Sequence, residues 1–133
     1  MLRTMCKGKI HRARVTEARL DYTGSIAIGP ELMRAADIVP YELVHVNNMA
    51  NAVHWETYAI AGKAGEICLN GCPARLFQPG DEVIILSLAQ LDDSELTDFS
   101  HKVVFVDDAN AIASTQVHKW SERCRAPLSM TKS

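Results

Sequence analysis

Short apolar runs separated by turn signals constrain the fold of this 133-residue chain more than any other feature of its sequence. The runs recur about every 8 to 15 residues, and glycine, proline or asparagine stands between most of them. They predict strands over residues 4–15, 25–28, 43–46, 53–61, 67–69, 83–91 and 103–106. One short helix is expected over 31–36, because Pro30 suits a first helical turn. Many short strands with few helices predict a small β-barrel.

Alternation within a strand predicts which side chains share a face. The residues expected on a shared face are Lys7, Lys9 and His11 in the first strand, and His54, Glu56 and Tyr58 in the fourth. The run 83–91 is the most hydrophobic in the chain and lacks alternation. It is therefore expected to be buried on both faces.

Composition and charge exclude several classes of partner. With 47% hydrophobic residues and a net charge of −2, the chain has a globular composition and no basic block, so no nucleic-acid partner is expected. No stretch approaches the roughly 18 apolar residues of a membrane span, so we expect no membrane partner and a cytoplasmic location. The cysteines lack zinc-site spacing, which predicts reduced thiols and no metal site. They are Cys6, Cys68, Cys72 and Cys124.

The dipeptide Gly24-Ser25 is the candidate for unusual chemistry. The Ser25 hydroxyl can attack the Gly24 carbonyl and convert the amide into an ester, and β-elimination then breaks the chain. Ser25 would end as a pyruvoyl group, an electron sink that supports amino-acid decarboxylation without a bound cofactor. A lone Gly-Ser pair is more typical of a flexible turn, so its interpretation depends on the rest of the chain.

Several blocks, in order along the chain, resemble the pyruvoyl-dependent aspartate 1-decarboxylase family. The blocks are RTM at 3–5, GKIHRA at 8–13, VTEA at 15–18, YTGS at 22–25, AI at 27–28, ETYAI at 56–60, CLNG at 68–71, ARL at 74–76 and PGDEVII at 79–85. The likeness covers residues 1–106, and Ser25 stands at the distance from the start that the family's cleavage site has.

The resemblance implies a mainly β fold, a six-stranded double-psi β-barrel with short helices over residues 1–106, assembled as a homotetramer. It implies cleavage into a β chain (1–24) and an α chain (25–133), with residues 107–133 as a C-terminal extension that ends in a loose tail. The implied cofactor is the covalent pyruvoyl group made from Ser25, with no metal and no pyridoxal phosphate. The implied reaction converts L-aspartate into β-alanine and carbon dioxide, which supplies pantothenate and coenzyme A.

The resemblance also assigns residue roles. Ser25, as pyruvoyl, would form a Schiff base with the substrate amine, and the Tyr58 phenol, protonated at neutral pH, would return a proton to carbon. The residues implied in processing are Gly24, Ser25, Thr57, Tyr22 and His11. The residues implied in substrate binding are Lys9, His54, Thr57, Asn70, Gly71, Cys72 and Pro73. Because Thr57 and Tyr58 are neighbours, they can serve one site only if the strand bends or two subunits contribute.

Three departures from the family lie on the substrate side. His54 replaces an arginine, which would hold a carboxylate more firmly than a pH-dependent imidazole does. Residues 70–74 read NGCPA where the family has NGAAA, and Pro73 has no N–H to donate. The loop at 62–65 is shorter than usual. These changes predict retained pyruvoyl chemistry with an altered substrate preference, rate or pH dependence.

Three functions therefore stay open on sequence alone. The first is a self-processing aspartate decarboxylase, and the second is a pyruvoyl decarboxylase for another small amino acid. The third is an unprocessed barrel that only binds a ligand or a partner chain. A hydrolase is disfavoured, because Ser25 lacks the Gly-x-Ser-x-Gly elbow.

Overall fold

Strands dominate the computed structural model, which describes residues 1–122. The strands are β1 (Leu2–Arg14), β2 (Glu17–Arg19), β3 (Ser25–Ile28), β4 (Leu43–Asn48), β5 (His54–Ala61), β6 (Ile67–Asn70), β7 (Glu82–Asp92), β8 (Ser100–Val106) and β9 (Ile112–Lys119). The helical elements are short, namely α1 (Pro30–Ala35), η1 (Cys72–Arg75) and η2 (Asp93–Asp98). The expected mainly β class with short helices is confirmed. The described residues carry nine strands, where the resemblance implied six in the barrel.

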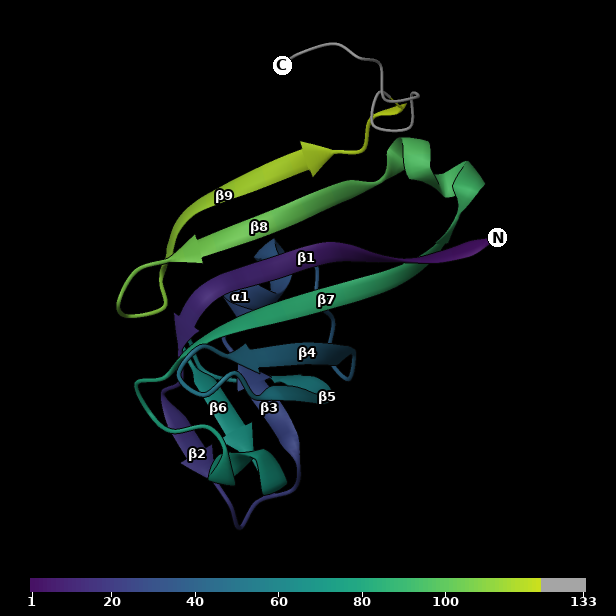
Figure 1. Cartoon of the computed structure of the whole chain (residues 1–133). Coiled ribbons are helices and arrows are strands. Elements are labelled where there is room, and N and C mark those ends of the chain that lie inside the picture. Colours follow the sequence, from purple (N-terminus) through teal and green to yellow (C-terminus); the bar gives the residue numbers. More distant parts are fainter. Residues whose placement is uncertain (123–133) are drawn as a thin grey trace.

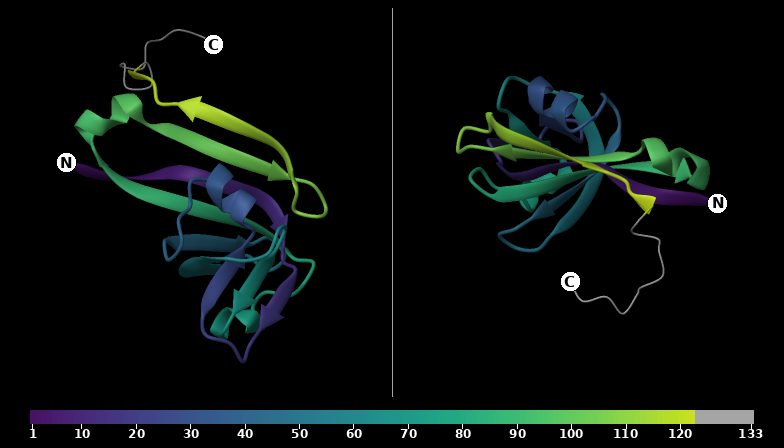
Figure 2. Two further views of the ribbon diagram at one scale, coloured as in Figure 1. Left: turned by 180° about the vertical axis from the view of Figure 1, so that it is seen from behind. Right: turned by 90° about the horizontal axis from the view of Figure 1, so that it is seen from above.

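These nine strands of the described residues join edge to edge in the order β2-β6-β3-β5-β4-β7-β1-β8-β9. The pairs β2–β6, β3–β5 and β1–β8 are parallel, and the other pairs are antiparallel. Figures 1 and 2 show β9, β8, β1 and β7 as a long arched layer, from which the strands turn through β4 and β5 to β3, β6 and β2. Strand twist of this kind wraps a sheet around a core, in keeping with a small barrel-like domain.

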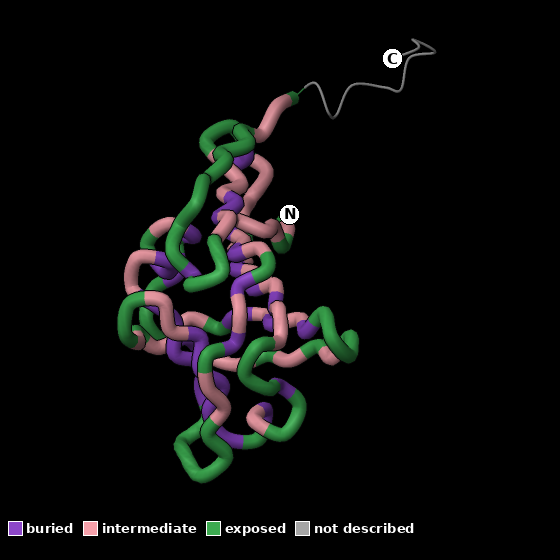
Figure 3. The backbone as a smooth tube through the Cα atoms, turned by 90° about the vertical axis from the view of Figure 1, so that its left-hand side faces the viewer, coloured by how far each residue is buried: buried purple, intermediate pink, exposed green. Residues whose placement is uncertain are grey.

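One face of this sheet, here called the inner face, carries the hydrophobic core, and the opposite face is called the outer face. Fully buried side chains on the core side include Ile10, Ile26, Leu69, Phe77 and Ile85. Figure 3 shows buried backbone running through the centre of the molecule, whereas β9 is exposed along its whole length. No helix in the described part of the chain has both the length and the apolarity needed to cross a bilayer.

The middle of β1 packs directly against the C-terminal end of α1. A Cβ added to Gly8 would lie 1.9 Å from the Ala36 carbonyl oxygen, so only glycine allows this approach of the two backbones. Leu32 and Met33 of α1 are buried in the core on the same side. The helix is therefore held to β1 by backbone contact as well as by its apolar face.

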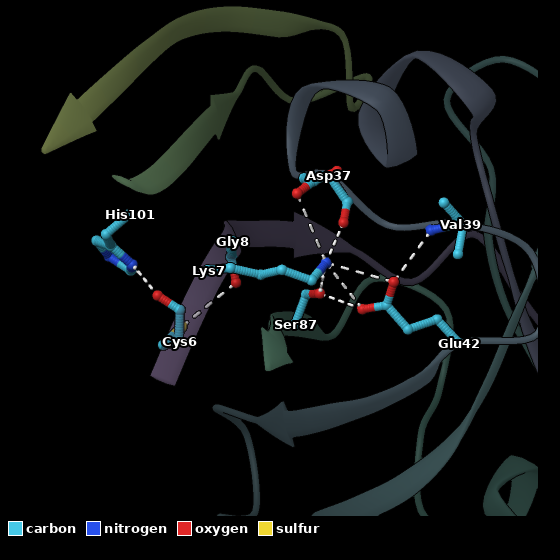
Figure 4. Close-up of polar contacts among 8 residues, drawn as sticks. All are labelled: Cys6, Lys7, Gly8, Asp37, Val39, Glu42, Ser87 and His101. Atoms are coloured by element: carbon cyan, nitrogen blue, oxygen red, sulfur yellow. Dashed lines mark hydrogen bonds and ion pairs between the residues drawn. The ribbon is translucent and has the colours of Figure 1, made fainter. Parts of the chain in front are cut away.

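A β-bulge at Lys7 makes one expected face wrong. The register of β1 against β7 shifts between Cys6 and Gly8, so strict alternation fails at this point. The Lys7 Nζ lies 3.0 Å from the Glu42 carboxylate and 2.6 Å from the Ser87 hydroxyl, and it also donates to the Asp37 carbonyl (Figure 4). Lys7 therefore ties β1 to β7 and to the chain before β4, instead of sharing a face with Lys9 and His11.

Two further expectations need correction. The run at 83–91 lies in β7, where residues 83–88 alternate between buried and half-buried and Gln90 is exposed, so the prediction of burial on both faces was wrong. Beyond Asp107 the described residues contain a whole strand, β9, which the sequence analysis did not predict. The loose tail expected for the last ten or so residues falls on 123–133, outside the described residues.

Candidate active site

Ser25 opens β3 and lies between β6 and β5. It pairs with Asn70 of β6, and since Ile26 pairs with Ala59 of β5, Tyr58 lies beside Ser25 at the same level. Cross-strand neighbours point to the same face of a sheet, and successive residues point to opposite faces. Ile26 and Ala59 are in the core, so Ser25, Asn70 and Tyr58 share the outer face.

The Ser25 hydroxyl is held by a chain of hydrogen bonds. The Asn70 Nδ2 donates to Ser25 Oγ at 3.1 Å, and the Cys68 thiol donates to Asn70 Oδ1 at 3.3 Å. Burial raises the pKa of the Cys68 thiol, and the Glu17 carboxylate raises it further, so the thiol keeps its proton near pH 7. The thiol thereby fixes the Asn70 amide with its NH₂ group toward Ser25. Ser25 itself is 2% exposed.

The peptide bond before Ser25 rests against a second glycine. Gly71 has φ +84°, and a Cβ on it would lie 2.9 Å from the Gly24 Cα. The Gly71 N–H donates to the Arg19 carbonyl at 2.8 Å, which joins the start of η1 to β2. A residue without a side chain is therefore required at position 71, where the end of β6 meets the candidate cleavage loop.

A small depression of 130 Å³ opens on the outer face beside Asn70. Its lining includes Tyr22, Ala27, Cys68 and Asn70. The Tyr22 ring is about half exposed and lies under the Arg19 guanidinium, 5.8 Å from its carbon. Since Asn70 pairs with Ser25, this depression lies next to the candidate cleavage site.

Thr57 is not brought to this face within one chain. It pairs with Val44, which is in the core, and β4 pairs with β5 without a register shift from His54 to Tyr58. β5 is therefore regular here, so Thr57 points to the face opposite Tyr58. A shared site for these two residues would need a second chain.

Lys9 and His11 lie on β1, several strands away from Ser25. They pair with Val103 and Phe105 of β8, two residues apart, so they share a face as expected. Lys9 also pairs with Leu86 of β7. The His11 Nδ1 is buried without a hydrogen-bond partner among the described residues, and its ring packs edge-on to Phe105 at 5.6 Å. Burial lowers the pKa of His11, and the nearby lysine and Arg12 lower it further.

His54 is already engaged by neighbouring polar side chains. Its Nδ1 lies 2.6 Å from Asn47 Oδ1, and its Nε2 lies 3.1 Å from Glu56 Oε2. The ring of His45, from β4, meets the His54 ring edge-on at 4.9 Å. Sequence alternation placed Glu56 beside His54, but His45 and Asn47 come from another strand and were missed. Only the β4–β5 register could have found them.

The segment after Asn70 is reshaped by its proline. Cys72 is exposed with a free thiol, whereas Pro73 is buried in η1. Among the backbone positions 71–73, which the resemblance implies in substrate binding, Pro73 has no N–H and the Gly71 N–H is occupied by the Arg19 carbonyl. In the described residues this leaves only the Cys72 N–H as a backbone donor for a substrate.

Comparison with known proteins fixes the family. The family model described as Aspartate decarboxylase matches residues 1–113. The chain belongs to the aspartate decarboxylase family. It is 51% identical over 123 residues to the aspartate 1-decarboxylase of Desulfitobacterium hafniense (strain DSM 10664 / DCB-2), covering 89% of this chain and 97% of that protein. It is 53% identical over 108 residues to that of Campylobacter jejuni (strain RM1221), covering 80% of this chain and 86% of the relative.

The match to the aspartate decarboxylase family extends past residue 106, where the likeness in the sequence motifs ends. The family model reaches residue 113, which includes the start of β9. A third relative, the aspartate 1-decarboxylase of Clostridium beijerinckii (strain ATCC 51743 / NCIMB 8052), is 51% identical and covers 84% of this chain and 92% of its own length. The family assignment therefore rests on nearly the whole chain.

Proposed function

We propose that this chain is a self-processing decarboxylase that converts L-aspartate into β-alanine and carbon dioxide, with a pyruvoyl group made from Ser25. The observation that carries the proposal is the Asn70 Nδ2 hydrogen bond to a buried Ser25 hydroxyl, next to the Gly24–Gly71 contact. The names of the 51–53% identical relatives support the same reaction. Neither line of support depends on the other.

The site suits the chemistry that makes the pyruvoyl group. Gly24 has no side chain to hinder attack of Ser25 Oγ on its carbonyl, which forms an ester and frees the Ser25 nitrogen. The bond from Asn70 orients the hydroxyl oxygen, and burial excludes competing water. Elimination then gives a carboxylate at Gly24 and a dehydroalanine at residue 25, and uptake of water with loss of ammonia leaves the keto group.

The outer face supplies the groups for the decarboxylation itself. When formed, the pyruvoyl group supplies an electron sink for the charge released with carbon dioxide. Tyr58, beside Ser25 on β5, has a phenolic hydroxyl and is the proton donor in this proposal. Lys9 is the proposed cation for a substrate carboxylate. Since it lies several strands from Ser25 within one chain, a neighbouring subunit would have to supply it.

The contacts of His54 favour a second candidate function, a pyruvoyl decarboxylase with a shifted substrate preference. Its two ring nitrogens are occupied by Asn47 and Glu56, so the imidazole is poorly placed to bind a carboxylate. A hydrogen bond to a charged group is worth about 1.5–3 kcal/mol, and its loss would weaken aspartate binding by about 10- to 150-fold. Another small amino acid without that carboxylate would lose nothing.

Intact-mass measurement under denaturing conditions tests the proposal. We expect two fragments, 1–24 and 25–133, the larger one lighter by one ammonia than a seryl N-terminus requires. Ser25→Ala should stay uncut, while Ser114→Ala, at an exposed serine of β9, should be cut normally. The cut protein is then assayed for carbon dioxide release from aspartate and from a panel of small amino acids. An uncut wild-type chain would reject the proposal, and release from a different amino acid would favour the second candidate.

A further inference from the structure

We propose that His45, His54 and Glu56 form a binding site for one divalent transition-metal ion such as Zn²⁺. These three residues are called the β4–β5 cluster. They lie on the outer face of β4 and β5, where His45 pairs directly with Glu56 and His54 is two residues along β5. The inference is independent of the proposed decarboxylation, because it concerns the binding of an ion and requires no cleavage at Gly24-Ser25.

The spacing of the donor atoms fits a tetrahedral ion. One donor atom from each residue lies within 4.8 Å of the other two. The Glu56 Oε2 is 3.1 Å from His54 Nε2 and 3.8 Å from His45 Nε2. Bonds of about 2.0–2.1 Å at tetrahedral angles place neighbouring ligand atoms about 3.3 Å apart. These two separations lie on either side of that value, so small side-chain rotations bring all three atoms to one ion.

Asn47 orients one ligand in the manner of an outer-shell partner. The Asn47 Oδ1 is a hydrogen-bond acceptor and lies 2.6 Å from His54 Nδ1, a contact that orients the His54 ring. On the other side of the ring, the His54 Nε2 faces the Glu56 carboxylate, 3.1 Å away. Metal-binding histidines are oriented in this way by a partner on their other nitrogen.

The ligand set indicates the class of ion. Two imidazoles and one carboxylate suit Zn²⁺, Co²⁺, Ni²⁺ and Cu²⁺, whereas Mg²⁺ and Ca²⁺ prefer oxygen ligands alone. His54 and Glu56 are each about half exposed, so an ion can enter and a water can fill the fourth position. The site is therefore of the open type with three protein ligands.

A second group of possible ligands is less suitable. Glu17, Glu66 and Cys68 also offer donor atoms within 4.8 Å. However, the Glu17 carboxylate is paired with Arg19 at 2.7 Å, and a cation next to a guanidinium is disfavoured. The Cys68 thiol donates a hydrogen bond to Asn70, so binding an ion through its sulfur would break the hydrogen-bond chain from Cys68 through Asn70 to Ser25. The β4–β5 cluster has neither conflict.

Zinc titration of the untagged, purified and chelator-treated protein tests the proposal. By calorimetry we expect one Zn²⁺ per chain. Affinity should fall at least tenfold in His45→Gln, His54→Gln and Glu56→Gln. Asn47→Ala, which keeps all three ligands, should bind about 10- to 100-fold more weakly because the His54 ring is no longer oriented by its outer-shell partner. Bound Co²⁺ should give a tetrahedral absorption spectrum without thiolate bands.

Two control variants separate this site from other possible ligands. His118→Gln, at an exposed histidine of β9, and Cys68→Ser, in the second ligand group, should bind Zn²⁺ as the wild type does. Circular dichroism checks that each variant is folded. The proposal is overturned if the wild type binds no stoichiometric zinc, or if zinc binds as tightly to the β4–β5 cluster variants as to His118→Gln. Unchanged affinity in Asn47→Ala would remove the orienting role of that residue.

Discussion

At the scale of single residues, the chemistry of Ser25 depends on a neighbour that does not touch it. The Cys68 thiol fixes the orientation of the Asn70 amide by a hydrogen bond, and the amide in turn fixes the position of the Ser25 hydroxyl oxygen. The thiol can act only while it keeps its proton, and burial ensures this by raising the pKa of Cys68. All the hydrogen bonds in this chain point the same way, from Cys68 to Asn70 to Ser25, so losing the first donor affects the last acceptor.

The hydrogen-bond chain predicts the cleavage rates of two Cys68 variants. Cys68→Ala removes the donor and should slow cleavage at Gly24-Ser25 by about 2- to 12-fold, the equivalent of one neutral hydrogen bond of about 0.5–1.5 kcal/mol. Cys68→Ser retains a donor and should be cut at nearly the wild-type rate. The fraction of uncut chain is followed by mass spectrometry after synthesis. Equal rates in Cys68→Ala and in Cys72→Ala, at an exposed thiol, would contradict the role of the chain.

The sequence predicted some of the residues that lie together in the candidate site and missed others. Ser25, Tyr58 and Asn70 were singled out, and the strand register brings them to one face. The partners of His54 were missed apart from Glu56, because alternation relates residues within a strand but does not relate two strands. Lys7 was misplaced because nothing in the local sequence signals a bulge.

At the scale of elements, strands with one buried face were predictable and strands without one were not. β3, β4, β5 and β7 follow apolar runs, and their positions were expected to within a few residues. β9 is exposed along its length and has no apolar face, so its sequence reads as polar loop. Pairing with β8 defines it as a strand, and such pairing depends on a distant part of the chain.

The contact of β1 with α1 predicts a strong effect of one methyl group. In Gly8→Ala the new Cβ would meet the Ala36 backbone at 1.9 Å, and backbone atoms there cannot turn aside as a side chain could. We expect a loss of about 1–3 kcal/mol in the free energy of unfolding, or more. Thr4→Ala, at an exposed position of the same strand, should change it by less than about 0.5 kcal/mol.

Chemical unfolding at a fixed protein concentration measures both variants, because assembly would make stability depend on concentration. A Gly8→Ala protein as stable as Thr4→Ala would show that β1 and α1 separate at little cost. The contact would then not hold the helix against the sheet.

At the scale of the whole molecule, an exposed apolar patch next to Tyr58 marks a surface that a single chain leaves open. Val39, Tyr41 and Leu43 are 58%, 77% and 57% exposed, and the Tyr41 ring lies 6.3 Å from that of Tyr58. Tyr41 adopts φ +71°, an unfavourable conformation for a bulky residue. Exposed apolar patches of this kind are typical of subunit interfaces. The proposed homotetramer would cover this one and could bring Lys9 to Ser25.

Light scattering after size-exclusion chromatography tests the assembly. The wild type should have the mass of four chains, whether or not each chain is cut. The double variant Tyr41→Lys/Leu43→Lys should give smaller species, because it places charges in the apolar patch. Lys119→Glu, a charge change at the far end of β9, serves as the control. A monomeric wild type, or a tetrameric double variant, would reject this interface.

The position of β1 between β7 and β8 bears on the order in which folding and cutting occur. Residues 1–24 contain an interior strand, hydrogen-bonded on both edges, as well as β2. A cut after Gly24 in the folded protein therefore leaves the short piece locked in place by its neighbours. If an unfolded chain were cut at the same place, folding would become a bimolecular reaction. The free peptide 1–24 would then have to bind from solution between β7 and β8. The nick is thus compatible with a stable product only when the sheet is already complete.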